Sequence, residues 1–153
     1  MRLPRGVTGL ADPNAGPARP PVSAKLARTV AHAATLAAGG VVVEERAPDG
    51  TPNFHLFHVE AAGERVAVLI HLTHRLVAFA EPLVEGSTEL AFRDHPPLAA
   101  AFEETTGFRP LSAAELGEPL TAADCADLDE VERKAVRYWR PQTAGAAIFN
   151  WLD

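Results

Sequence analysis

The chain has 153 residues, of which 47% are hydrophobic and 22% are charged, and its formal net charge at pH 7 is −6. This length suffices for one domain with an apolar core, so the fold needs neither a metal nor a disulfide. The acidic balance counts against nucleic-acid binding, because a basic face supplies most of the affinity for phosphates. Four basic residues near the end of the sequence are interpreted as a solvated helix face: Arg133, Lys134, Arg137 and Arg140.

Three features of the sequence indicate a cytoplasmic protein. No apolar run approaches the roughly 18–20 residues of a membrane-spanning helix. The opening residues, MRLPRGVTGLADP, lack the apolar stretch of a signal peptide. The lone cysteine, Cys125, excludes an internal disulfide, as is usual in a reducing compartment. It lies between acidic residues, which favours an unreactive thiol. We therefore expect no association with a membrane.

The first two predicted elements are an extended arm and a helix. Residues 1–22 contain five prolines and three glycines, a density that neither a helix nor a central strand tolerates. Ser23 has the character of a helix N-cap, and apolar residues then recur at helical spacing. Gly39 and Gly40 are typical of a helix end. These patterns predict a helix over 23–38.

Short β-rich segments follow over residues 41–94. They are rich in β-branched and aromatic residues, and the turns between them are too short for parallel connections. We predict an antiparallel β-meander of four to five strands, at residues 41–47, 53–61, 65–72, 74–82 and 87–94. One face of strand 53–61 carries polar residues and is expected to face solvent.

Residues 95–153 are predicted to be helical. Pro96 and Pro97 favour a helix start, capping-box patterns begin at Ser112 and Asp127, and Pro141 separates two further helices. The whole chain, residues 1–153, is therefore expected to form a single α+β domain. Its N-terminal helix and C-terminal helices should be packed on one face of the sheet.

The histidines raise the question of a catalytic or metal site. His55 and His71 are expected to be cross-strand neighbours, with His74 and Arg75 close by in the sequence. These four residues are the candidate lining of a pocket between the sheet and the C-terminal helices. No metal or other cofactor is predicted, because two histidines are too few ligands for zinc. The sequence also has no recognisable nucleophile motif.

Aromatic residues are concentrated at the end of the sequence. RYWRPQTAGAAIFNWLD, residues 137–153, contains both tryptophans and the only tyrosine. Helical spacing assigns Ala144, Ile148 and Trp151 to a buried face. Trp139 remains as the aromatic residue available to a partner.

Several segments resemble a family of small, uncharacterised bacterial proteins. They are LPRGVTGL at the start, TPNFH and VAFAEP in the middle, and RYWRPQTAGAAIFNWLD at the end. The family has an N-terminal LPRG-x-TG motif and a C-terminal YWxP…FNxxD motif, with a bulkier aromatic residue before the final Asp. The resemblance implies a bacterial cytosolic protein with a role like that of toxin-immunity or other interaction proteins.

We therefore expect a non-enzymatic protein–protein interaction module of the immunity or antitoxin type. Its negative charge favours encounter with a basic partner protein. The candidate contact residues are Glu130, Glu132, Trp139 and Arg140. The alternative is a small-molecule-binding domain or hydrolase that uses the histidine-lined pocket. The sequence predicts no particular oligomeric state.

Overall fold

The computed structural model describes residues 1–15, 20–48 and 50–151. Pro17 of the expected arm and position 49 of the first expected turn lie outside these ranges. Five strands form an antiparallel sheet in the order β1-β2-β3-β4-β5, and β6 runs parallel to β4. The strands are β1 (Val41–Arg46), β2 (Phe54–Ala61), β3 (Glu64–His71), β4 (Leu76–Ala80), β5 (Phe92–Arg93) and β6 (Arg109–Pro110).

Side-chain caps set the main helix boundaries. Ser23 Oγ accepts a hydrogen bond from the N–H of Leu26 at 3.0 Å, and His95 Nδ1 accepts one from the N–H of Leu98 at 3.2 Å. The helices are α1 (Ala24–Ala37), α2 (Pro96–Thr106), α3 (Ala113–Leu116), α4 (Glu130–Trp139) and α5 (Ala144–Ile148), with 3-10 turns at Pro13–Ala15 and Ala123–Cys125. The α+β class, the N-terminal helix, the antiparallel meander and the C-terminal helices are confirmed.

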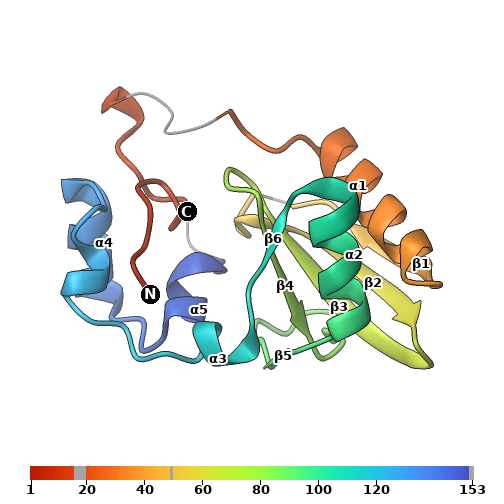
Figure 1. Ribbon diagram of the computed structural model, residues 1–153. Helices are drawn as coiled ribbons and strands as arrows, with labels where there is room; N and C mark the ends of the chain where they lie inside the picture. The colour runs from red at the N-terminus through yellow and green to blue at the C-terminus, as the bar shows by residue number, and fades with distance from the viewer. Residues whose placement is uncertain (16–19, 49, 152–153) are drawn as a thin grey trace.

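Apolar side chains line both faces of the sheet. Alternation along β2 directs Phe57 and Val59 toward α1 and α2, and directs Phe54 and Leu56 toward α5 and the start of the chain. Figure 1 shows α1 and α2 side by side against the first face. Helices therefore cover two faces, where the sequence predicted one. The prediction that one side of strand 53–61 faces solvent is wrong, because both sides of β2 are largely buried.

The turn between β2 and β3 fixes the register of the central hairpin. Ala62 and Gly63 both have positive φ angles, 54° and 76°, as a two-residue hairpin turn requires. His55 consequently pairs with Ile70, while His71 pairs with Phe54. His55 and His71 therefore point to opposite faces, so the prediction that they are neighbours is wrong.

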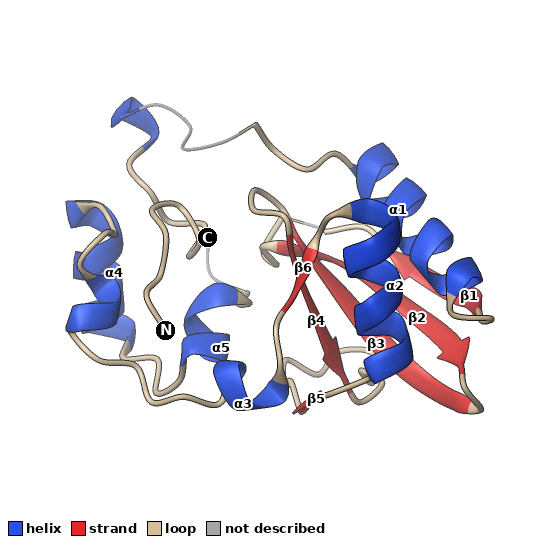
Figure 2. Ribbon diagram, in the orientation of Figure 1, coloured by secondary structure: helices blue, strands red, loops and turns tan. Residues whose placement is uncertain are grey.

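Residues 1–12, here called the N-terminal segment, pack into the protein without helix or strand structure (Figure 2). Leu3 and Val7 are fully buried, and the N–H of Leu3 donates to the carbonyl of Asp124 at 2.8 Å. The segment lies between α4 and α5 (Figure 1). None of the helices within the described ranges has the length and apolarity to cross a bilayer.

Candidate functional site

Glu132, expected on an exposed partner surface, is instead fully buried. Its carboxylate accepts hydrogen bonds from the N–H of Gly6 at 2.8 Å and from the hydroxyl of Thr8 at 2.5 Å. It also accepts the N–H of Asp129, which completes a capping box at the start of α4. This cap lies two residues after the predicted one at Asp127. Glu132 thus holds the N-terminal segment and does not face a partner.

Asn53, His71 and Asn150 form a second polar network around Val7. Asn53 Nδ2 donates to the carbonyls of Val7 at 3.3 Å and Ile148 at 2.7 Å, and its Oδ1 accepts the N–H of Asn150 at 2.8 Å. His71 Nε2 donates to the same Val7 carbonyl at 2.7 Å. Three of the segments that carry the family resemblance therefore meet at one buried point.

His71 is held in a single neutral tautomer. Because Nε2 donates to Val7, Nδ1 is the acceptor, and it receives the N–H groups of Thr73 and His74, each at 3.1 Å. Desolvation by complete burial lowers the pKa of His71 to about 3. A general base needs a reachable nitrogen and a pKa near the working pH. His71 is therefore a structural residue.

The remaining candidate pocket residues are scattered. His55 Nε2 donates to the carbonyl of Val22, just before α1, at 2.9 Å. His74 stays beside His71, with ring centroids 5.2 Å apart. The exposed Arg75 lies over the ring of Phe108, 5.3 Å from its centroid. His55 and His71 lie on opposite faces of the sheet, and none of these four candidate residues lines the hollows described below.

His58, which the sequence did not single out, anchors a long loop. Its Nε2 accepts the N–H of Leu83 at 3.0 Å, and its Nδ1 lies 3.2 Å from a carboxylate oxygen of Glu44. Burial lowers the pKa of His58, as it does that of His55. Most of the buried histidines thus fasten neighbouring segments to the sheet.

These histidines predict a loss of stability in mild acid. The pKa values of His55, His58 and His71 lie below 6.5 in the folded protein, so below that pH the unfolded chain binds more protons. Falling pH therefore favours unfolding. His71 alone should lower the free energy of unfolding by about 1.2 kcal/mol between pH 6 and pH 5. Urea denaturation at both pH values measures this, and His71→Gln should flatten the dependence. An equal slope in the two proteins contradicts the prediction.

Neither a metal centre nor a reactive thiol emerges from the described residues. No three His, Cys, Asp or Glu side chains gather closely enough there to hold a metal ion. Burial, followed by the charges of Asp124 and Glu132, raises the pKa of the Cys125 thiol. This thiol is therefore poorly suited to nucleophilic chemistry.

The candidate contact residues on α4 do not form one surface. Glu130 and Arg140 are exposed and Trp139 is half-buried, but Glu132 is enclosed. Glu130 and Trp139 are separated by about 13 Å of helix rise and two and a half turns, so they lie on opposite sides of α4. Tyr138, which is 93% exposed, is the large side chain that the helix does present to solvent.

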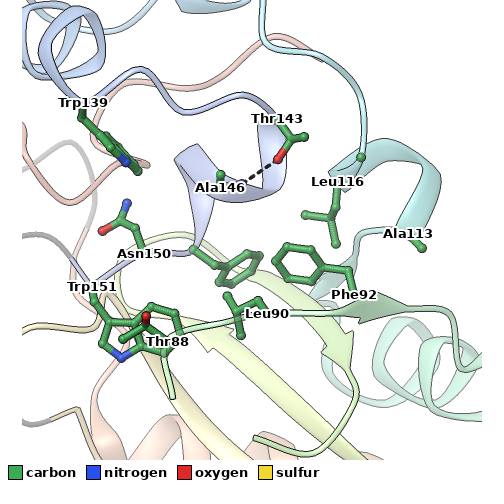
Figure 3. Close-up of a pocket in the computed structure, with 12 residues that line it drawn as sticks. Thr88, Leu90, Phe92, Ala113, Leu116, Trp139, Thr143, Ala146, Asn150 and Trp151 are labelled. Atoms are coloured by element: carbon green, nitrogen blue, oxygen red, sulfur yellow. Dashed lines mark hydrogen bonds between the residues drawn. The ribbon is translucent and has the colours of Figure 1, made fainter. Parts of the chain in front are cut away.

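A groove of about 590 Å³ lies between residues 88–92 and the C-terminal helices. Figure 3 shows Trp139, Asn150 and Trp151 at one end and Leu116 and Ala113 at the other. The lining residues are Thr88, Leu90, Phe92, Ala113, Leu116, Gly117, Trp139, Thr143, Ala146, Phe149, Asn150 and Trp151. Both tryptophans of the protein therefore line this groove, which we call the aromatic groove.

The chain positions the groove walls through short local contacts. Thr143 Oγ1 accepts the N–H of Ala146 at 3.2 Å and starts α5 (Figure 3). Gly145 allows close packing, because a Cβ there would lie 2.7 Å from the ring of Phe92 and 2.9 Å from the carbonyl of Leu116. Trp151 lies beyond α5 and is half-buried, with its ring edge-on to Phe54 at 5.1 Å. The predicted burial of Ala144 and Ile148 is confirmed, whereas Trp151 packs against the core but is only partly buried.

Two further hollows help to define the site. One of about 400 Å³ shares Trp151 and Thr88 with the aromatic groove and continues to Glu85 and Arg46. Another of about 620 Å³ lies beside the β2–β3 turn, but it is lined by glycines, alanines, Val41 and charged residues, without an aromatic ring. The aromatic groove and the hollow that shares Trp151 with it together form the more extended apolar surface.

Comparison of the chain with protein-family models, with curated proteins and with solved structures found no match.

Proposed function

We propose that the protein is a non-enzymatic interaction module of the immunity or antitoxin type that binds a segment of a basic partner protein in the aromatic groove. The observation that carries the proposal is the groove's lining, which has four aromatic side chains and no titratable side chain among its twelve residues. Aromatic residues are enriched and charged residues depleted at the centres of protein interfaces. Acid–base catalysis, in contrast, requires a titratable group within reach of the substrate.

Charge supports a basic partner over an acidic one. The chain carries a net charge of −6, and Glu85 lines the hollow that adjoins the aromatic groove. Complementary charges at the rim of an interface speed encounter and disfavour partners of the wrong sign. Of the four contact residues expected from the sequence, Trp139 belongs to the proposed site, whereas Glu130, Glu132 and Arg140 do not line the groove.

The tryptophans allow a direct test of occupancy. A partner captured from a lysate of the source organism and then purified should shift the intrinsic fluorescence, since both tryptophans line the groove. Trp151→Ala should weaken binding by about 2 kcal/mol, or roughly thirtyfold, as truncation of an interface anchor does. The measurement is calorimetric titration of each variant with the purified partner.

Leu36→Ala is the matched control for this experiment. Leu36 is an exposed apolar residue, 77% accessible, on α1 at the other face of the sheet. Its replacement should leave the affinity unchanged. Equal affinities for wild type and Trp151→Ala would remove the groove from the proposal.

The volume of the aromatic groove also suits a small molecule, the second candidate ligand. Pockets for such ligands typically enclose about 300–1,000 Å³ and are mainly apolar with a few polar groups. Asn150, Thr88 and Thr143 supply polar groups here. Native mass spectrometry of freshly purified protein distinguishes the two, because a retained small ligand adds a fixed mass that Trp151→Ala should lose.

A further inference from the structure

One wall of the aromatic groove is the free edge of the sheet. Within the described ranges β5 is the last strand on its side and pairs with β4 alone, while α3 packs beside it. The N–H of Glu81 donates to the carbonyl of Ala91 at 2.9 Å, so the pairing continues beyond the end of β5. Thr88, Leu90 and Phe92 line the groove at every second position, which is the period of an extended strand.

The backbone groups of Leu90 point to the outer side of this edge. Successive residues of an extended chain direct their N–H and C=O groups to opposite sides. Because the carbonyl of Ala91 is directed toward β4, the N–H and C=O of Leu90 are directed away from it. Across the described ranges, neither group forms a backbone hydrogen bond with another loop or turn. Leu90 therefore presents a donor and an acceptor beside the groove.

We propose that the partner segment binds as an added β-strand along residues 88–92, with alternate side chains in the aromatic groove. This inference rests on the proposed function and specifies its binding mode. Strand addition uses main-chain hydrogen bonds for affinity and pockets at every second residue for specificity. The hollow beyond Trp151 and Thr88 extends the same line and receives a further side chain of the segment.

The charge of the edge selects a segment that contains lysine or arginine. Residues 81–91, EPLVEGSTELA, include three glutamates and no basic residue. Glu85 and Glu89 are exposed, and Glu85 lines the adjoining hollow together with Arg46. The arginines at this edge are already ion-paired, Arg46 with Glu44 and Arg93 with Glu81. Two copies of this acidic edge repel each other, since charges on an edge strand oppose edge-to-edge pairing. The occupant is therefore an extended basic segment of a partner protein, with bulky apolar residues at alternate positions.

Selection from a random-peptide phage library provides the probe. The full chain is immobilised, and peptides are kept if they bind wild type but not Trp151→Ala. Hydrogen exchange followed by NMR should then show the Leu90 amide slowed by about tenfold or more on binding, because it becomes hydrogen-bonded. The amide of Val43, on the opposite edge strand β1, is the control and should not change. Alanine scanning of the peptide should find important residues at every second position, and a required lysine or arginine.

The possible outcomes separate this inference from the proposed function. A Trp151-dependent peptide that leaves Leu90 exchange unchanged, or whose key residues recur every three or four positions, overturns strand addition and leaves the groove as a binding site. Selected peptides that are acidic overturn the charge preference. If no selected peptide depends on Trp151, both the inference and the groove proposal fail.

Discussion

Replacing Glu132 by alanine is expected to lower the free energy of unfolding by about 3 kcal/mol, since each buried donor left without an acceptor costs about 1–3 kcal/mol. The carboxylate accepts hydrogen bonds from the N–H and hydroxyl of Thr8 and from the N–H groups of Gly6 and Asp129. Its loss releases the N-terminal segment and opens the cap of α4 together. Urea denaturation of the purified variant measures the change.

Two further substitutions make this result specific. Glu130→Ala, at an exposed position on the same helix, should change stability by less than about 0.5 kcal/mol. Glu132→Gln keeps the shape of the side chain but turns an amide group toward N–H donors. Its loss of stability should therefore lie between those of Glu130→Ala and Glu132→Ala. A Glu132→Ala protein as stable as Glu130→Ala would show that the network contributes nothing to folding.

Phe149→Ala is expected to destabilise the protein by about 3–5 kcal/mol, the usual cost of removing a buried phenylalanine. The ring is 2% exposed and packs with Phe54 and Phe92, each at 6.0 Å, and with His71 at 5.8 Å. Its removal leaves a cavity where the sheet meets the end of the chain. The midpoint and slope of a urea denaturation curve give the change in free energy.

Tyr138→Ala is the matched control, since Tyr138 belongs to the same aromatic-rich stretch but is 93% exposed. It should alter stability by no more than about 0.5 kcal/mol. Similar losses for Phe149→Ala and Tyr138→Ala would contradict the packing described for this region.

The local elements of the fold were largely predictable, because residues inside or beside each element specify them. Ser23 caps α1 and Gly39 follows its end with a φ of 77°. Gly107 ends α2 in a left-handed conformation. The short turns between β-branched segments likewise required an antiparallel meander. Strand 87–94 was overestimated: only Phe92–Arg93 is a strand, although residues 88–92 line the groove at strand spacing.

Long-range features were not predictable from these patterns. The two-residue turn at Ala62–Gly63 shifts the hairpin register from the expected one, and such a shift moves a side chain to the other face. His55 and His71 were separated for this reason. Glu132 was misjudged because two of its partners, Gly6 and Thr8, lie over 120 residues away in the sequence. Its local partner did leave a sign, because Asp129 and Glu132 have the spacing of a capping box.

The candidate site was foreseen only in part. Trp139 was retained as a functional aromatic residue, and it does line the aromatic groove. The wall that Thr88 and Leu90 form was not predictable, because it depends on how the 81–91 loop returns to β4. The available sign was that Leu90 and Phe92, two positions apart, share one face of the predicted strand 87–94.

The contacts between the N-terminal segment and residues near position 150 affect how the chain folds during translation. Asn150 Nδ2 donates to the carbonyl of Thr8 across 142 positions of sequence. During translation, Leu3 and Val7 therefore lack their final neighbours until the residues near position 150 have been synthesised. Contacts so distant in sequence slow folding and prolong exposure of apolar surface. The nascent chain should consequently depend on chaperones more than a protein of this size with local contacts.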